Sequence, residues 1–151
     1  MNINIVGGSW LRDRNNYDKE MCDANGWECI QNTHYDAIIN GERFEVKKTK
    51  SSGVIIKLQQ LADILLDKKL SDINYLIIRT DQKQQKIIKT YIISGIELCK
   101  IMNISKQLAE KVLYVHNAFE CTLQTTVKLR DIEKHESCST NLSTAFAEAH
   151  R

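Results

Sequence analysis

The strongest local signal in the chain lies in Tyr35-Asp-Ala-Ile-Ile39, Asn40-Gly41 and Glu42-Arg-Phe-Glu-Val-Lys-Lys-Thr-Lys50. Two segments with strand character flank Asn-Gly, which is a preferred sequence for a two-residue hairpin turn. We therefore predict two antiparallel strands, over 35–39 and 42–50, joined by a tight turn.

The turn fixes the register of this hairpin. Counting outward, Ile39 faces Glu42 and, three steps further, Asp36 is expected directly opposite Glu45. Because side chains alternate along a strand, one face should be apolar and enter the core, and the other should be polar. The predicted apolar face has Tyr35, Ala37, Phe44 and Val46, and the predicted polar face has Asp36, Glu45, Lys47 and Thr49.

Two carboxylates that face each other are unfavourable for the hairpin, since directly opposed like charges destabilise a sheet by roughly 0.2 to 1 kcal/mol. A divalent cation between Asp36 and Glu45 would reverse the sign of this interaction. Mg²⁺ suits the place, because it binds one or two carboxylates, keeps several waters and completes its coordination with substrate phosphate. Lys47 adds a positive charge where a phosphate or an attacking hydroxide would lie. The alternative interpretation is a solvated strand face whose charges protect a sheet edge.

Glycines and changes of hydrophobic period place the other elements, because the chain contains no proline. Upstream we predict a helix that is capped by Asn15-Asn16, runs to about residue 24 and ends at Asn25-Gly26, followed by a strand over 27–31. Downstream we predict a helix over 56–69, antiparallel strands over 73–79 and 86–93, helices over 96–102 and 105–117, and a strand over 122–129. This order predicts a mixed α/β or α+β fold with a central mixed sheet flanked by helices.

The length of 151 residues fits one domain, which we place at 1–132. Its core is expected at about 13–93, with further helices and a strand at 95–130. Residues 133–151 are rich in Ser and Thr, and we expect a loosely held polar tail with a short helix over 144–150.

Composition argues against several classes of protein. The net charge of +2 does not indicate a nucleic-acid binder by bulk charge, so any such surface must be local. No apolar run approaches the roughly 18 residues of a membrane span, and no targeting signal is recognised, so we expect a soluble, cytoplasmic protein. Five cysteines are an odd number without metal-binding spacing, which argues against a disulfide scaffold and against zinc.

The hairpin motif resembles that of the PD-(D/E)xK nuclease superfamily. Asp36 is followed nine residues later by Glu45-Val46-Lys47, and a helix with Glu20 and a strand after Gly26 precede it in the order usual for that family. The resemblance covers about residues 13–80 and implies a restriction-endonuclease-like core. The sequence departs from the family pattern before Asp36, where Tyr35 replaces proline.

The resemblance implies a role for each matching residue. Asp36 and Glu45 would hold a catalytic Mg²⁺, for which Mn²⁺ can substitute, and the Val46 main-chain carbonyl would complete its coordination. Lys47 would orient or activate the water, and Glu20 would support a second metal or its water. The implied reaction is metal-assisted hydrolysis of a phosphodiester.

Further residues are candidates to contact substrate or DNA, although each is also compatible with an ordinary surface or helix position. A basic stretch near the motif could follow a DNA backbone. The segment after residue 95 has the look of a helix-turn-helix, with two packed helices that complete the core as the preferred alternative. The candidates are His34, Lys48, Lys50, Lys57, Gln59, Gln60, Lys106 and Gln107.

These features together predict a Mg²⁺-dependent DNA endonuclease, most like a small type II restriction enzyme. Because one site cuts one strand, we expect duplex DNA to be cut by a homodimer or a higher symmetric oligomer. Two alternatives stay open. One is a homing or Holliday-junction-resolving nuclease of the same fold, and the other is a catalytically inactive DNA-binding or interaction module.

Overall fold

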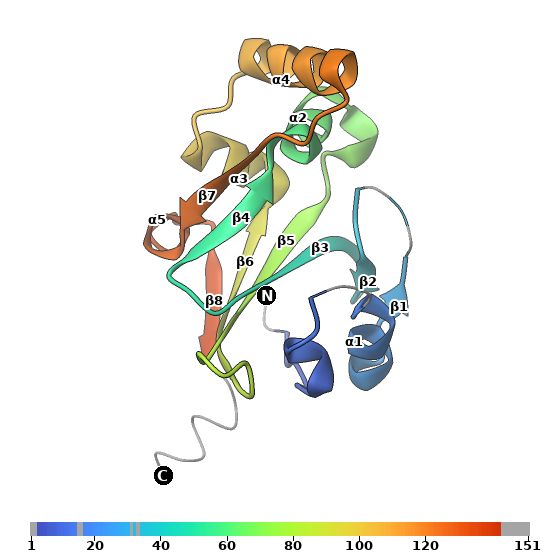
Figure 1. Ribbon diagram of the computed structural model, residues 1–151, viewed down its shortest axis with the longest axis vertical. Helices are drawn as coiled ribbons and strands as arrows, with labels where there is room; N and C mark the ends of the chain where they lie inside the picture. Colours follow the sequence, from blue (N-terminus) through green and yellow to red (C-terminus); the bar gives the residue numbers. More distant parts are fainter. Residues whose placement is uncertain (1–2, 15–16, 31, 33, 143–151) are drawn as a thin grey trace.

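A six-stranded mixed sheet forms the centre of the molecule (Figure 1). The computed structural model describes residues 3–14, 17–30, 32 and 34–142. Its β3 and β5 are parallel, and the other neighbouring strands of the sheet are antiparallel. The strands follow one another across the sheet in the order β1 (Glu28–Cys29), β2 (Ala37–Ile39), β3 (Glu42–Thr49), β5 (Asn74–Thr80), β6 (Ile87–Ser94) and β8 (Ser139–Leu142). The predicted mixed α/β class with a central mixed sheet is confirmed.

The β2–β3 hairpin has the predicted turn and register. Asn40 and Gly41 have φ values of 52° and 79°, the left-handed conformation that a tight two-residue turn requires. The pairs Ile39–Glu42 and Ala37–Phe44 are formed as expected. The paired ladder then stops, because the chain bends at Asp36, which lies outside β2.

The bend at Asp36 places Tyr35 on the other face of the sheet. The Tyr35 ring packs against the core that contains Tyr75, and the Arg43 guanidinium lies over it at 5.2 Å. Phe44 and Val46 are buried in the opposite core, as predicted. The prediction that Tyr35 shares their face is wrong, because strand alternation ends where the backbone bends.

The connection from β3 to β5 contains an unpredicted strand, β4 (Gly53–Lys57), followed by α2 (Leu58–Leu66) and the 3₁₀ helix η2 (Lys68–Leu70). β4 pairs with β7 (Gln124–Lys128) in a separate two-stranded antiparallel sheet. The predicted helix over 56–69 therefore begins later and ends in a 3₁₀ turn. The predicted antiparallel pairing of the two strands that became β5 and β6 is confirmed.

Two apolar cores lie on the two faces of the sheet. One lies between the sheet and α2, α3 (Gly95–Ile101) and α5 (Leu129–Glu133), and α4 (Lys106–Phe119) packs on α2. The other is formed with η1 (Ser9–Leu11) and α1 (Asp18–Asn25), and Trp10 is fully buried in it. Figure 1 shows α2 and α4 at one end of the molecule and α1 beside β1 at the other.

Some predicted boundaries differ from the observed ones. The first helix is described from Asp18, and its Asn15-Asn16 cap lies outside the described residues, as does the predicted helix over 144–150. Gly26 ends this helix in the left-handed conformation, as predicted. The expectation of a loose tail is wrong for Ser139–Leu142, which pairs with β6 because that strand has a free edge. None of the described helices has the length and apolar character needed to cross a membrane.

Candidate active site

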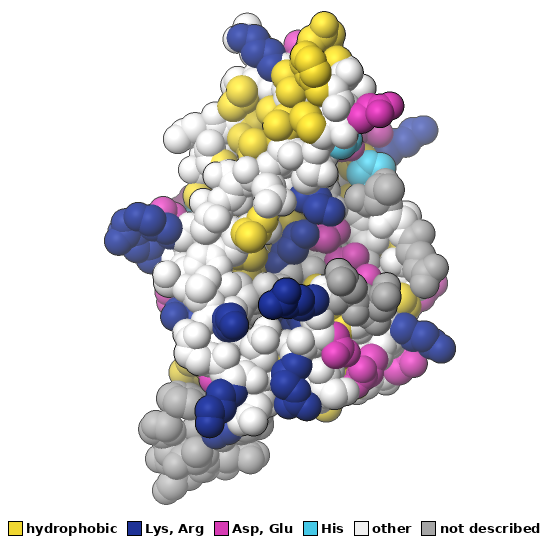
Figure 2. Space-filling model, in the orientation of Figure 1, with side chains coloured by type: hydrophobic (Ala, Val, Ile, Leu, Met, Phe, Trp, Pro, Cys, Tyr) yellow, Lys and Arg dark blue, Asp and Glu magenta, His cyan; other side chains and the backbone are white. Residues whose placement is uncertain are grey.

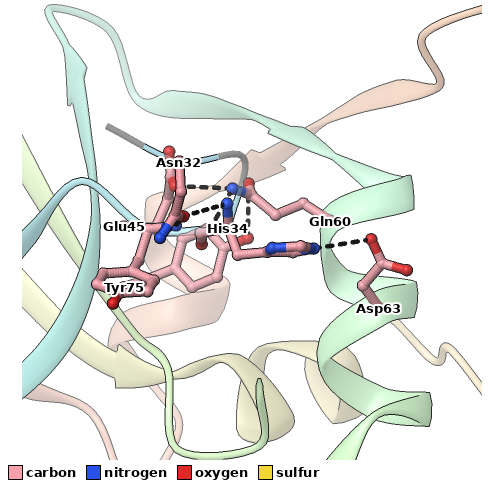
Figure 3. Close-up of polar contacts among 7 residues, drawn as sticks. Asn32, His34, Glu45, Gln60, Asp63 and Tyr75 are labelled. Atoms are coloured by element: carbon pink, nitrogen blue, oxygen red, sulfur yellow. Dashed lines mark hydrogen bonds and ion pairs between the residues drawn. The ribbon is translucent and has the colours of Figure 1, made fainter. Parts of the chain in front are cut away.

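A pocket of about 430 Å³ opens between the hairpin and α2. Asp36 and Glu45 lie on its hairpin side, Gln60 and Asp63 reach it from α2, and His34 reaches it from the segment before β2. Figure 3 shows Gln60 reaching towards Glu45 and the His34 ring directed towards Asp63 on the far side. The predicted polar face of the hairpin therefore contributes to a concave site.

The carboxyl groups of Asp36 and Glu45 belong to the same pocket, and Asp36 Oδ2 accepts a hydrogen bond from the N–H of Val46, the residue after Glu45. Glu45 is only 7% exposed, and its pKa is raised to about 8, mainly by burial and then by the negative charge of Asp36. A hydrogen bond between the two carboxyl groups acts in the same direction. With this raised pKa, Glu45 is largely protonated at neutral pH.

Lys47 lies beside this pair and partly compensates its charge. Its Nζ is 3.5 Å from Glu45 Oε1, and its presence lowers the pKa of Glu45 less than burial and Asp36 raise it. The predicted grouping of two acids and one lysine is present in the structure. The three charged groups are close enough to act on one ligand.

Gln60 and Tyr75 hold the Glu45 side chain in place through a chain of hydrogen bonds. Gln60 Nε2 donates to Glu45 Oε2 at 2.7 Å and to the His34 carbonyl at 3.3 Å. The Tyr75 hydroxyl, which is fully buried on β5, donates to Gln60 Oε1 at 3.1 Å. Gln60 was predicted only as a weak substrate contact, and the structure places it as a support of Glu45. Tyr75 was missed, because its place beside Glu45 comes from the parallel pairing of β3 with β5.

His34 and Asp63 form the opposite wall of the pocket. His34 Nε2 is 3.3 Å from Asp63 Oδ2, and both side chains are about one-third exposed. Lys57 and Gln59 also line the pocket, and Gln59 Oε1 accepts a hydrogen bond from the Leu123 backbone at 3.0 Å. His34, Lys57 and Gln59, which the sequence suggested as substrate contacts, therefore all line the acidic pocket.

Glu20 is not among the residues that line this pocket. It is exposed on α1, and its Oε1 accepts a hydrogen bond from Ser9 Oγ at 2.5 Å. Asp18 is the acid of α1 that the site affects. Its pKa is raised by burial and then by the charge of Asp36, and is lowered by Lys47 and Lys48. Two positions along a helix correspond to a rotation of about 200°, so the start of α1 decides which acid faces the hairpin.

The predicted basic contacts divide into two groups. Lys48 is committed to the backbone, because its Nζ donates to the carbonyls of Trp10 at 2.7 Å, Leu11 at 3.1 Å and Asp13 at 2.5 Å. Burial lowers the pKa of Lys48, which packs its ammonium over the Tyr17 ring at 4.1 Å. Lys48 therefore anchors η1 to β3 and is not free to follow DNA.

The other basic candidates are exposed but lie apart from one another. Lys50 follows β3, whereas Lys106 and Gln107 lie in the first turn of α4. The last turn of the same helix reaches the acidic pocket through His116, about 15 Å further along the axis. The structure therefore does not bring Lys106 and Gln107 to the acids.

The donor atoms of the acidic pocket fit Mg²⁺. Val46 N–H donates to Asp36 Oδ2 at 2.8 Å, and the N–H and C=O of one strand residue point to the same side, so the Val46 carbonyl faces Asp36. Two carboxylates and one carbonyl suit a cation that keeps several waters. Within the described residues, no group of three His, Cys, Asp or Glu side chains gathers around a point that could hold a metal ion.

Comparison with known proteins assigns no family to the chain. No known family model matches it, and no curated protein matches it.

Proposed function

We propose that this protein is a Mg²⁺-dependent DNA endonuclease with a restriction-endonuclease-like core. The observation that supports the proposal most is that Asp36 and Glu45 line one pocket, with Lys47 Nζ 3.5 Å from Glu45 Oε1. Glu45 is buried with Asp36 in the same pocket, and two neighbouring acids are unfavourable unless a proton or a cation compensates their charge. The order α1, β1, the β2–β3 hairpin, α2 and β5 also supports this core.

Asp36 and Glu45 would hold the cation, together with the Val46 carbonyl. When bound, Mg²⁺ would polarise a phosphoryl oxygen and supply an activated water at neutral pH. Lys47 would orient that water and stabilise the negative charge that develops on the phosphate. Gln60, held by Tyr75, would keep Glu45 in one rotamer, so that the carboxylate needs no reorganisation on binding.

Duplex DNA cut by a homodimer is the proposed substrate and assembly, because one pocket per chain cuts one strand. A homing or junction-resolving activity would use the same pocket. The two are separated by offering a four-way junction and a linear duplex of the same sequence in one reaction.

The test is cleavage of a supercoiled plasmid and of a random duplex library with Mg²⁺, Mn²⁺, Ca²⁺ or EDTA. We expect cutting with Mg²⁺ and Mn²⁺ and none with EDTA, and we expect Asp36→Asn and Lys47→Ala to lose it. Asp23→Asn and Lys83→Ala are matched controls, since both residues are exposed and lie outside the pocket.

Equal cutting by the pocket variants and the controls would remove the site assignment. An inactive module makes a different prediction, because it binds DNA equally well with and without Mg²⁺ and produces no nicks under any condition. That result would support an inactive DNA-binding module instead of a nuclease.

A further inference from the structure

A second charged pocket lies at the other end of β4. It has a volume of about 380 Å³, and Ser52, Arg79, Lys128 and Arg130 contribute to its lining. β4 begins one residue after Ser52 and ends at Lys57, which lines the acidic pocket. A strand of this length spans about 16 Å. We call the second site the basic pocket.

Like charges face each other beside the basic pocket. Arg79 on β5 is directly opposite Lys89 on β6, a pairing that is unfavourable for a sheet by itself. Lys128 at the end of β7 and Arg130 on α5 add two more cations. Figure 2 shows Lys and Arg side chains projecting at the place where Figure 1 has α5.

The acidic side chains near the basic pocket are largely engaged. Glu133 lines it, but its Oε1 already forms an ion pair with Lys89. Asp131 is 3.7 Å from Arg130 Nε, and both side chains are about half exposed or more, so this pair is weak. The protein therefore leaves the pocket with an excess of positive charge.

Arg79 is the clearest sign of an external partner. Its side chain is half-buried, and within the described part of the chain no carboxylate pairs with its guanidinium. An arginine does not lose its proton to relieve burial, and a buried charge without a partner is costly. The planar guanidinium group matches the geometry of a phosphate, which it can bind through two hydrogen bonds.

We propose that the basic pocket binds a phosphate group through Arg79, Lys128 and Arg130. The phosphate has two sources with the same chemistry, a nucleic-acid backbone or free inorganic phosphate. Binding of phosphate in the basic pocket follows from the charges of that pocket and does not require the acidic pocket to be catalytic. Only the choice of a nucleic-acid backbone as the source of the phosphate rests on the proposed function.

The spacing of the two pockets is compatible with one DNA strand. Glu45 is opposite Tyr75 and Thr49 is opposite Arg79, so the pockets lie four residues apart along β5, on the same face. Four strand residues correspond to about 13 Å. This distance equals the axial rise of about four phosphates in one strand, at about 3.4 Å each.

The first experiment is a titration with inorganic phosphate in EDTA, followed by backbone and arginine side-chain NMR signals. We expect saturable shifts at Arg79 Nε–H and at the amides near Ser52 and Leu129. Arg79→Gln and Arg130→Gln should each weaken binding about tenfold, whereas Lys68→Gln, an exposed control on η2, should not. Arg79→Lys retains the charge and should bind more tightly than Arg79→Gln, and thermal unfolding of each variant shows that it is folded.

The second experiment measures binding of duplex DNA in EDTA at several salt concentrations, so that no cleavage is needed. A backbone phosphate in the pocket predicts that each variant reduces the salt slope by about 1. Phosphate shifts without a change in DNA binding would support the free anion as the source. A changed salt slope without phosphate shifts would support the DNA backbone.

The proposal is overturned if neither inorganic phosphate nor DNA binding responds to the Arg79 and Arg130 variants. Failure of the nuclease proposal would look different. DNA or phosphate would still bind in EDTA, and Mg²⁺ would produce no cleavage.

Discussion

The acidic pocket and the basic pocket solve the same electrostatic problem in different ways. Asp36 and Glu45 line the acidic pocket, Arg79 faces Lys89 on the neighbouring strand beside the basic pocket, and β4 runs from one pocket to the other. In the acidic pocket the protein neutralises itself, because Glu45 can retain a proton, and its pKa is raised to about 8. Arginine has no such option, so the basic pocket keeps its charge at every physiological pH.

This difference explains the difference in burial. Glu45 can be 7% exposed because its neutral form costs little to bury, whereas Arg79 stays half-buried with access to solvent. A cation that enters the acidic pocket must therefore displace a proton, but an anion that enters the basic pocket displaces only water.

The largest expected effect separates the two pockets by kinetics. Asp36→Asn should reduce kcat for Mg²⁺-dependent DNA cleavage by about 10²- to 10³-fold or more, because the group acts on the reacting phosphate. Arg130→Gln should instead raise KM with little change in kcat, because it removes binding that is equal in the ground state and the transition state. Steady-state kinetics on one duplex substrate measures both, and similar losses of kcat in the two variants would erase the distinction.

The next effect concerns stability as a function of pH. Glu45 has a folded-state pKa above its usual value of 4.5, so its contribution to stability is fully present below pH 4.5 and is lost as the pH rises towards 8. Glu45→Gln mimics the protonated acid, since an amide can donate to Asp36 and accept from Gln60. The variant should match the wild type at pH 4 and exceed it at pH 8.5 by a few kcal/mol, because one pKa unit corresponds to about 1.4 kcal/mol.

Urea unfolding at a series of pH values measures this effect. Arg79→Gln is the matched comparison, because arginine does not titrate in this range and the difference from wild type should be independent of pH. A pH-independent Glu45→Gln difference would mean that the pKa of Glu45 is not raised in the folded protein.

A smaller effect should follow from Lys48→Met. The ammonium of Lys48 is the donor to three backbone carbonyls around η1, so its removal should destabilise the fold by about 1 to 3 kcal/mol. The salt slope of DNA binding should not change. Chemical denaturation and DNA titration together test this, and a reduced slope would return Lys48 to the DNA-contacting surface.

The smallest effect is expected for Tyr75→Phe. The change removes the hydroxyl that donates to Gln60 Oε1 and should reduce the free energy of unfolding by about 1 kcal/mol. It should also reduce kcat modestly with no change in phosphate binding, since the basic pocket is distant. Parallel stability and activity measurements show whether the chain Tyr75–Gln60–Glu45 supports only the acidic pocket.

Local sequence signals were enough for the hairpin, and therefore for the centre of the acidic pocket. Asn40-Gly41 fixes the register as far as the pair Ala37–Phe44, and Asp36, which lies beyond the last paired residue, still lines the same pocket as Glu45. Dense apolar character likewise identified β5, which is buried on both faces. These features depend on residues that are neighbours in the chain.

Features that depend on distant partners could not be read from the sequence. β4 has a partner, β7, that lies some seventy residues later, so nothing near Gly53–Lys57 distinguishes it from the start of a helix. Asp18 rather than Glu20 faces the hairpin because of where α1 begins. The basic pocket was missed for the same reason, since Arg79 and Arg130 come together only when α5 packs on β6, the strand that pairs with β5.

The short strand β8 has a protective consequence for the whole molecule. It pairs with the outer side of β6, a strand rich in isoleucine that would otherwise present its backbone N–H and C=O groups to other chains. Exposed apolar edges of this kind are templates for intermolecular pairing. A chain shortened after residue 133 would keep the residues that line both pockets but would leave the edge of β6 uncovered. We expect such a chain to aggregate rather than to unfold.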